Sequence, residues 1–460
     1  MTSRHNIAVL DIGKTNAKVV VVDAATGAEI AARSVANTVI REGPYPHYDV
    51  DMLWDFVVGA LASFVKAPGV DAISVTAHGA AAALLGDDAL AMPVIDYEYE
   101  YPESVRSAYR KLRPPFAETS SPRLSGGLNV GAQVHFQKTE FPEAFAKVRT
   151  ILTYAQYWVW RLTGIAVNEV TSLGCHTDLW NPQANAYSSL VDTLGIRDLM
   201  APIRSAFERI GNLAPAVAGK IGGDRAIPVY CGIHDSNASL LPHLMTRKSP
   251  FAVVSTGTWV VSFAVGGQLE RLDPDRDTLA NVDANGHAVP SARFMGGREF
   301  DILTAGDKRE PDAGTLRDVV DRRLMILPGV VNGSGPFPQR KAVWPNGEPS
   351  GSWERNSAAS LYAAMMTHTC LGLIGASGPT VVEGPFSRNG VYLSALRSLT
   401  SREIIALPGS TGTSLGAALL AGATCDLQQS SAMVEPLGEE FLAYAAEWRE
   451  RLSDNEKAGH

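Results

Sequence analysis

The sequence predicts an α/β protein built from two halves that resemble each other in layout. Strand-like and helix-like segments alternate along the chain, and the strand segments are short apolar runs typical of parallel sheets. Residues 7–22 and residues 251–265 each have the pattern of a strand, a tight polar loop and a second strand. The length of 460 residues is sufficient for two or three domains.

The composition is that of a folded protein without a nucleic-acid or membrane partner. Hydrophobic residues make up 45% of the chain and charged residues 19%, and the net charge is −8. Such a chain lacks the concentrated basic face that nucleic acids and anionic lipids require. No stretch approaches the roughly 18 uncharged apolar residues of a membrane span. The N-terminus leads directly into a strand pattern without a signal peptide, so a cytoplasmic location is expected.

The four cysteines are widely separated and form no CxxC pair. This spacing is unsuited to a zinc ribbon or a redox motif, and a disulfide framework is not expected in so long a chain. We expect all four to be small apolar side chains in a reducing compartment.

Periodicity predicts the elements of the first half in order. Apolar residues recur at helical spacing from Met52 to Phe64, and Ala72 to Thr76 has the pattern of a strand. Residues 97–122 predict a helix followed by an irregular loop. The aromatic-rich segment from Ala155 to Leu162 predicts a buried helix.

The pattern restarts near Ile227 with a strand, a sharp polar turn and a helix, and the second hairpin follows. The proline- and glycine-rich residues 327–349 predict a long surface insertion. Helices are predicted over residues 358–374 and 415–421, and over much of the last thirty residues. We expect the boundary between the halves near residues 240–249.

The tip of the first hairpin, DIGKTNAK, has the chemistry of a phosphate-binding loop. Gly13 permits a close backbone approach, so successive N–H groups can point at an anion. Lys14 and Lys18 could neutralise phosphate charge, and Asp11 could hold Mg²⁺ directly or through water. A solvated hairpin turn explains the same residues equally well.

Two further segments are each ambiguous when taken alone. The second hairpin tip, Ser255 to Thr258, repeats the backbone-donor pattern and adds three hydroxyl groups. Asp235 follows a strand and begins a helix, so it is either a helix cap or a general base for a hydroxyl nucleophile. The P-loop, the dinucleotide fingerprint and HExxH are absent.

The segments DIGKTNAK, GIHDSNAS, STGTWV, EGPFSRN and GSTGTSLGAALLAG occur in an order and spacing that resemble the FGGY family of carbohydrate kinases. Within that family the sequence looks most like the rhamnulokinase branch. The resemblance implies two ribonuclease-H-like domains of the actin-like ATPase type, with ATP and Mg²⁺ in the cleft between them. It places the N-terminal domain at residues 1–242, the C-terminal domain at 243–445 and a helix end and tail at 446–460.

The resemblance also implies roles for individual residues. Asp235 matches the catalytic base, and Asp11 and Asp235 match the metal-associated acids. The residues that match nucleotide-binding positions are Asp11, Gly13, Lys14, Thr15, Asn16, Lys18, Thr256, Gly257, Thr258, Gly384, Asn389 and Gly412. The residues that match sugar-binding positions are His78, Gly79, Asp96, His234, Asp235 and Arg293.

The chain departs from the family pattern in both the nucleotide-binding and the sugar-binding motifs. Pro385 and Phe386 replace flexible glycines of the adenosine motif, and Asp96, Tyr97 and Glu98 replace the usual sugar-binding tryptophan-aspartate-arginine pattern. We therefore expect an ATP-dependent kinase of a small ketose or polyol, with a rhamnulose- or fuculose-like sugar as the first candidate, acting as a monomer or homodimer. A catalytically weak sugar sensor on the same fold and an ATPase that acts on a protein partner are the alternatives.

Overall fold

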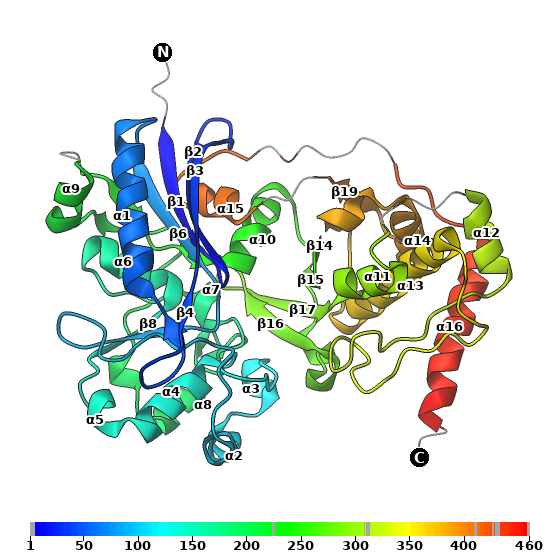
Figure 1. Cartoon of the computed structure of the whole chain (residues 1–460), viewed down its shortest axis with the longest axis horizontal. Coiled ribbons are helices and arrows are strands. Elements are labelled where there is room, and N and C mark those ends of the chain that lie inside the picture. Colours follow the sequence, from blue (N-terminus) through cyan, green and yellow to red (C-terminus); the bar gives the residue numbers. More distant parts are fainter. Residues whose placement is uncertain are drawn as a thin grey trace. The chain divides into compact units, whose positions relative to one another are not determined.

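The computed structural model describes residues 5–222, 226–307, 309, 313–408, 412–425, 427 and 433–457. The chain divides into two units (Figure 1). The first comprises residues 1–246, 280–288 and 411–427, and the second comprises residues 247–279, 289–410 and 428–460. The domain limits predicted at residues 242 and 445 stay a prediction.

The first unit combines a mixed sheet with helices on both of its faces. Its strands are β1 (Asn6–Ile12), β2 (Asn16–Asp23), β3 (Glu29–Ala36), β4 (Val39–Ile40), β5 (His47–Tyr48), β6 (Ala72–Ala77), β7 (Ala82–Leu85), β8 (Thr150–Thr153), β9 (Trp180–Asn181), β10 (Ala186–Tyr187), β11 (Arg209–Asn212), β12 (Pro228–Tyr230) and β13 (Ile233–His234). Its helices are α1 (Val50–Lys66), α2 (Glu103–Leu112), α3 (Phe116–Thr119), α4 (Val130–Glu140), α5 (Pro142–Phe145), α6 (Tyr154–Thr163), α7 (Val170–Leu173), α8 (Ser189–Thr193), the 3₁₀ turn Arg197–Leu199, α9 (Pro215–Ile221), α10 (Asp235–Thr246) and α15 (Thr413–Leu420).

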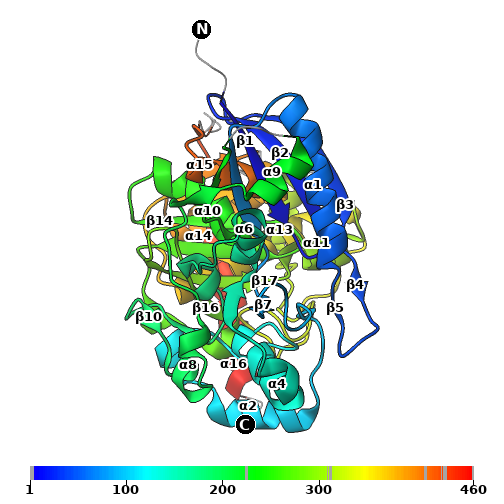
Figure 2. The same cartoon turned by 90° about the vertical axis from the view of Figure 1, so that its left-hand side faces the viewer.

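The main sheet of this unit has the strand order β11-β12-β6-β1-β2-β3, and β13 also pairs with β6. Side chains alternate along β1, so its two faces enter different cores. Leu10 and Ile12 pack in one core with residues of α1, α6 and α9, which lie toward the viewer in Figure 2. Ile7 and Val9 pack in the other core with α10 and α15. Asp11 lies one residue from Leu10 and Ile12, so it faces the side of α10 and α15.

Three parallel strands end together and place the candidate site. β1 and β13 both run parallel to β6, with Asp11 and Ile233 each opposite Thr76. The residues that leave these strands are therefore neighbours at one edge of the sheet. His78 follows β6, and Asp235 follows β13 as the first residue of α10.

A fully buried carboxyl group supports β13 from the side. Glu169 caps α7 by accepting hydrogen bonds from the backbone N–H groups of Thr171 (2.9 Å) and Ser172 (3.2 Å). The Thr171 hydroxyl donates to Glu169 Oε2 at 2.5 Å and accepts from the backbone N–H of His234 at 3.0 Å. This chain of hydrogen bonds ends one residue before Asp235. Burial raises the pKa of Glu169 to about 7, against the lowering effect of its hydrogen bonds to Thr171 and Ser172.

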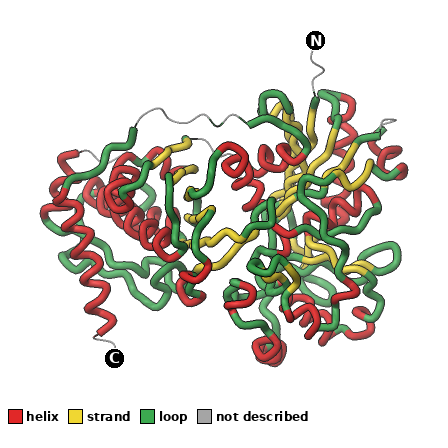
Figure 3. Tube along the Cα trace, turned by 180° about the vertical axis from the view of Figure 1, so that it is seen from behind, coloured by secondary structure: helices red, strands yellow, loops and turns green. Residues whose placement is uncertain are grey.

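The second unit repeats the arrangement of the first around its own sheet. Its strands are β14 (Phe251–Thr256), β15 (Val260–Val265), β16 (Thr278–Val282), β17 (Ala288–Phe294), β18 (Thr380–Glu383) and β19 (Ile404–Leu407), in the sheet order β16-β17-β15-β14-β18-β19. Residues 280–288, which include the end of β16 and the first residue of β17, are counted with the first unit. Its helices are α11 (Gly296–Thr304), α12 (Ala313–Asp321), α13 (Ser352–Leu373), α14 (Gly390–Thr400), α16 (Glu439–Lys457) and the 3₁₀ turns Leu269–Arg271, Pro274–Arg276 and Pro385–Arg388. Figure 3 shows these helices gathered beside the strands.

The sequence prediction of two α/β halves, each led by a hairpin, is confirmed. β1 pairs antiparallel with β2 and parallel with β6, and β14 pairs in the same way with β15 and β18. The predicted helices near residues 52–64, 155–162, 358–374 and 415–421 are present, each with slightly different limits. Cys175, Cys231 and Cys370 are buried, and Cys425 is partly exposed. No helix in the described part of the chain is both long and apolar enough to cross a membrane.

We predict that Gly416→Ala lowers the stability of the first unit. A Cβ atom at this position would lie 1.7 Å from the backbone oxygen of Ala238, where α15 crosses α10. Forcing an atom into such a contact costs about 1–3 kcal/mol. Gly59→Ala is the matched control, since a Cβ there meets nothing within 4 Å and alanine should stabilise the middle of α1 by about 0.5–1 kcal/mol. Denaturant unfolding of both variants measures the difference, and equal stabilities would contradict the close helix contact.

We predict that the effect of Glu169→Gln on stability depends on pH. The pKa of Glu169 is about 7 in the folded state and about 4.3 in the unfolded state. The protonated carboxyl group therefore contributes its full stabilisation below about pH 4.3, and this stabilisation is lost as the pH rises through about 7. Glutamine does not titrate, so the stability advantage of the wild type over the variant should shrink between about pH 5 and pH 7. Unfolding free energies measured across this range test the prediction, and a constant difference would contradict it.

Candidate functional site

Asp235 lies at the N-terminus of α10 with a carboxylate that is held from one side and open on the other. Its Oδ1 accepts a hydrogen bond from the backbone N–H of Ser236 at 2.6 Å and lies 3.1 Å from Nε2 of His234. The side chain remains 31% exposed. Burial raises the pKa of Asp235, and the hydrogen bonds from Ser236 oppose this shift. A fixed, partly open carboxylate of this kind can accept a proton from a hydroxyl group.

Asp11 is the second acid at this edge of the sheet. The hydroxyl of Thr413 donates a hydrogen bond to its Oδ2, so α15 fixes the orientation of the carboxylate. Burial raises the pKa of Asp11, and the negative charge of Asp235 raises it further. Two carboxylates that repel each other attract a divalent cation to the space between them.

The donor set fits a Mg²⁺ ion that retains waters. The described residues contain no group of three or more histidine, cysteine or acidic side chains that could hold a metal ion. Mg²⁺ commonly binds to one or two carboxylates together with water and substrate phosphates. Asp11 and Asp235 provide that minimum.

The turn between β1 and β2 presents backbone groups in a constrained loop. The N–H of Gly13 donates to the backbone oxygen of Asn16 at 3.0 Å, and a Cβ on Gly13 would lie 2.9 Å from that oxygen. The side chain of Asn37 donates to the backbone oxygen of Gly13 at 2.8 Å. Thr15 and Asn16 are exposed, and Lys18 lies opposite Asp11 on β2, 3.9 Å from Glu29.

Lys14 differs from the rest of this turn because its ammonium group is engaged by acids. Its Nζ is hydrogen-bonded to Oδ1 of Asp96 and lies 3.5 Å from Oε2 of Glu98. The same atom lies 5.1 Å from the ring centroid of Tyr48 and 4.8 Å from that of Tyr97. Lys14 was predicted to bind the nucleotide and Asp96 to bind the sugar, and the structure brings the two side chains into contact.

The predicted sugar-side residues of the first unit form one cluster with Asp235. Nδ1 of His78 lies 2.7 Å from the backbone oxygen of Gly79. A Cβ on Gly79 would lie 2.7 Å from Nε2 of His234, so glycine is required for this close approach. Burial lowers the pKa of both His78 and His234 to about 4. Both rings are therefore neutral near pH 7 and do not compete with Asp235 for protons.

In the second unit, the turn from Thr256 to Thr258 is packed against two glycines. The Thr256 hydroxyl donates to the backbone oxygen of Glu383 at 2.5 Å and accepts from the N–H of Phe386 at 3.0 Å. A Cβ on Gly384 would lie 1.9 Å from the backbone oxygen of Thr256, and one on Gly297 would lie 2.0 Å from the backbone oxygen of Gly257. These contacts hold the turn against α11 and the 3₁₀ turn that begins at Pro385.

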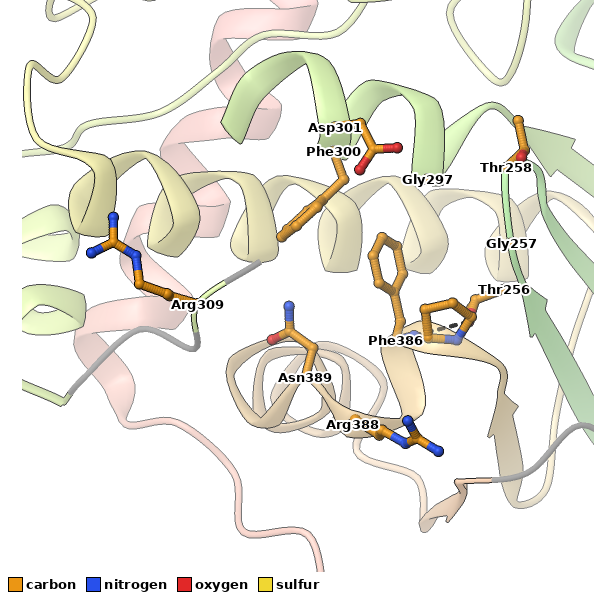
Figure 4. Close-up of a pocket in the computed structure, with 11 residues that line it drawn as sticks. Thr256, Gly257, Thr258, Gly297, Phe300, Asp301, Arg309, Phe386, Arg388 and Asn389 are labelled. Carbon is orange, nitrogen blue, oxygen red and sulfur yellow. Dashed lines mark hydrogen bonds between the residues drawn. The ribbon is translucent and has the colours of Figure 1, made fainter. Parts of the chain in front are cut away.

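A cavity of about 300 Å³ opens beside this turn (Figure 4). The rings of Phe300 and Phe386 extend toward each other, edge to face, with centroids 5.4 Å apart. The remaining wall is formed by Thr256, Gly257, Thr258, Gly297, Asp301, Arg309, Pro385, Arg388 and Asn389. Apolar rings, hydroxyl groups and two guanidinium groups in one cavity suit a nucleoside that carries phosphates.

Three other predicted residues have structural contacts. Asn389 accepts from the N–H of Tyr392 at 3.0 Å and thereby caps α14, and its side chain also borders the cavity. Gly412, with φ of 64°, precedes the first turn of α15 in the first unit. Arg293 lies on β17 with Nε 2.9 Å from Asp277, and it is not among the described residues that line the cavity.

The structure thus divides the predicted residues between the units. The first unit holds Asp11, Gly13, Lys14, Thr15, Asn16, Lys18, His78, Gly79, Asp96, His234, Asp235 and Gly412. The second holds Thr256, Gly257, Thr258, Arg293, Gly384 and Asn389. Sequence reasoning missed Thr413, Tyr48 and Phe300, whose partners are remote in sequence. A capping pattern of acid, any residue, then a hydroxyl residue could have drawn attention to Glu169 and Thr171.

Comparisons with known proteins identify the family of this chain. A model of the N-terminal domain of the FGGY family of carbohydrate kinases matches residues 6–242, and a model of the C-terminal domain of carbohydrate kinase FGGY matches residues 248–430. A comparison with curated proteins found no match. The crystal structure of a carbohydrate kinase from Novosphingobium aromaticivorans is 35% identical, covers 98% of this chain and 99% of that chain, and has a TM-score of 0.91.

More distant solved structures share the fold. A ligand-bound xylulose kinase from Lactobacillus acidophilus is 18% identical, with 99% of this chain and 98% of that chain covered and a TM-score of 0.79. Plasmodium falciparum glycerol kinase with ADP is 12% identical, with 98% of each chain covered and a TM-score of 0.78. The two-unit α/β fold and the family resemblance of the sequence are both confirmed. The chain belongs to the FGGY family of carbohydrate kinases, which are ATP-dependent phosphotransferases with an alcohol group as acceptor.

Proposed function

We propose that this kinase transfers the γ-phosphate of ATP to a hydroxyl group of a small ketose or polyol, with Asp235 as the general base. A rhamnulose- or fuculose-like sugar is the first acceptor to test, because the sequence looks most like that branch. The observation that carries the proposal is the Asp235 carboxylate, which is fixed by Ser236 and still 31% exposed.

The surroundings of Asp235 favour its role as a base. His78 and His234 are neutral near pH 7 because burial lowers their pKa values to about 4. The raised pKa of Asp235 strengthens the carboxylate as a proton acceptor while it remains ionised. A sugar hydroxyl that donates a hydrogen bond to Asp235 would lose its proton as the oxygen attacks phosphorus.

Asp11, Asp235 and the two hairpin turns would stabilise the negative charge of the phosphate groups. Asp11 and Asp235 would hold Mg²⁺, which when bound would offset negative charge on the phosphate oxygens. The N–H groups of Gly13 and Gly257 bond to the backbone oxygens of Asn16 and Trp259 and thereby fix the two turns, whose other backbone N–H groups would be the donors for phosphate oxygens. Most of the catalytic effect in phosphoryl transfer comes from positioning and charge stabilisation of this kind.

The cavity of the second unit supports nucleotide binding in spite of the altered adenosine motif. Phe386, which replaces a family glycine, forms a wall of the cavity together with Phe300. A nucleobase can pack against such rings, and Arg388 borders the same space. The predicted cleft between the domains, in which both substrates would meet, stays a prediction.

The proposal is tested by ADP release from the purified protein with Mg-ATP and a panel of acceptors. The panel contains rhamnulose, fuculose, ribulose, xylulose, erythritol and glycerol, and Asp235→Ala is the blank. Turnover on one acceptor that is absent in the blank supports the proposal. Binding of a sugar without any product would favour the sugar-sensor alternative.

We predict that Asp235→Asn loses turnover and retains substrate binding. The amide keeps the shape of the side chain and the acceptor oxygen for Ser236, but it cannot take a proton. A positioned general base contributes about 10²–10⁴-fold to the rate. Steady-state kinetics and calorimetric titration with ATP and the acceptor measure the two effects. Asp55→Asn, on an exposed face of α1, is the control, and wild-type turnover in Asp235→Asn would remove Asp235 from the mechanism.

We predict that Gly384→Ala weakens nucleotide binding. The new Cβ would lie 1.9 Å from the backbone oxygen of Thr256, so the turn at Thr256 must shift. Residue 384 also has a φ of 80°, which alanine rarely adopts. Misplacing this wall of the cavity should raise the Kd for ADP by about tenfold or more, as for a loss of one or two hydrogen bonds. Gly390→Ala, six residues later with nothing within 4 Å of its Cβ, should bind ADP normally. Equal affinities in the two variants would place the nucleotide elsewhere.

A further inference from the structure

We infer that Lys14 recognises the sugar rather than the phosphate, and that its ion pair with Asp96 makes the site select uncharged sugars over sugar acids. This inference rests on the proposed function and names the acceptor class of the same site. The residue occupies a turn whose sequence suits phosphate, so only the geometry of the side chain distinguishes the two roles.

The Lys14 side chain points toward two acidic residues outside its own turn. Its ammonium group contacts Asp96 and Glu98, and only 16% of the side chain is exposed. Asp96 is fixed in turn, because its Oδ1 also accepts from the N–H of Glu98 at 3.2 Å and from the hydroxyl of Tyr48 at 3.4 Å. The ammonium therefore points into the segment around Asp96 and not along the backbone N–H groups of its own turn.

Aromatic rings surround the ion pair and provide a surface for a sugar. Nζ of Lys14 lies 5.1 Å from the ring of Tyr48 and 4.8 Å from that of Tyr97. The ring of His78 packs on both tyrosines, with centroid distances of 5.1 Å and 5.5 Å. The C–H faces of a sugar ring or chain can pack against such rings while its hydroxyl groups find polar partners.

An unpaired buried atom indicates that a polar ligand belongs in this cluster. Nε2 of His78 has no hydrogen-bond partner within the described part of the chain, although the residue is only 6% exposed. A buried polar atom without a partner is costly unless a ligand or water satisfies it. A sugar hydroxyl group beside His78 would provide the missing hydrogen bond.

The cluster adjoins the proposed base. Nδ1 of His78 lies 2.7 Å from the backbone oxygen of Gly79, and Gly79 lies against the ring of His234. Nε2 of His234 lies 3.1 Å from Oδ1 of Asp235. The charge of Lys14 acts on His78. A small acceptor that contacts Asp235 is thus within reach of the Lys14–Asp96 pair.

Charge then decides the acceptor class. One ammonium group faces two carboxylates, Asp96 and Glu98, and the negative charge of Asp235 also acts on the neighbouring Tyr97. The positive charge of Lys14 is already compensated, so a carboxylate on the substrate would meet net repulsion. A neutral hydroxyl group can still accept a hydrogen bond from the third N–H of the ammonium group and donate one to Asp96.

The first experiment compares Lys14→Met with Lys14→Arg on the best acceptor of the panel. Lys14→Met should raise the KM for the sugar by about tenfold or more, the effect of losing one charged hydrogen bond, with the KM for ATP within about twofold of the wild type. Lys14→Arg, which keeps the charge, should recover most of the sugar affinity. Lys66→Met, at the exposed end of α1, is the control.

The outcomes separate the inference from the proposed function. A higher KM for ATP with an unchanged KM for the sugar would overturn the inference and return Lys14 to the phosphate. Absence of turnover in the wild type on every acceptor would count against the proposed function. In that case calorimetric titration of the same sugars into wild type and Lys14→Met still tests Lys14, and equal affinities would overturn its role. Thermal unfolding of each variant checks that it is folded.

The second experiment tests charge selection with Asp96→Asn. The probes are rhamnulose and rhamnonate, or ribulose and ribonate if ribulose is the better acceptor. Removing one carboxylate should lower the ratio of the Ki of the sugar acid to the KM of the neutral sugar by about tenfold or more. The exposed Asp88→Asn is the matched control and should keep the wild-type ratio. An unchanged ratio in Asp96→Asn would overturn the charge-selection step.

Discussion

The candidate site of the first unit depends on the register of three parallel strands. Because β1 and β13 both pair with β6 at the same level, Asp11, His78 and Asp235 emerge at one edge without any long loop to position them. A shift of β13 by one residue would turn Asp235 to the opposite face of the sheet. The hydrogen bonds from Glu169 through Thr171 to the N–H of His234 oppose such a shift.

The second unit uses the same strand arrangement for a different chemistry. Where the first hairpin carries Asp11 and two lysines, the second carries threonine hydroxyl groups in a turn packed against Gly297 and Gly384. Its neighbouring loop contributes Phe386 to a cavity, whereas the first unit gathers acids and neutral histidines. One framework of hairpin and parallel strand thus supports both an acidic site and a nucleoside-sized cavity.

Local patterns in the sequence were sufficient for the hairpins, the main helices and the two polar turns, because each depends on residues within one or two turns of chain. The partners of the side chains were not predictable in this way. Lys14 binds Asp96 across 82 residues, and Asp11 binds Thr413 across 402 residues. Only the folded chain shows that Lys14, which has the type and place of a phosphate ligand, is directed toward Asp96 and two tyrosines.

The hydrogen bond from Thr413 to Asp11 has a consequence for the order in which parts of the chain can fold during synthesis. Helix α15 covers the face of the first sheet that carries Ile7 and Val9, together with α10. A ribosome synthesises the chain from its N-terminus, so this covering helix emerges only after residues 247–279 and 289–410 of the second unit. Until residue 420 has been made, that apolar face lacks part of its cover, and the carboxylate of Asp11 lacks its hydroxyl donor. The earliest strands of the chain are therefore among the last to reach their final environment.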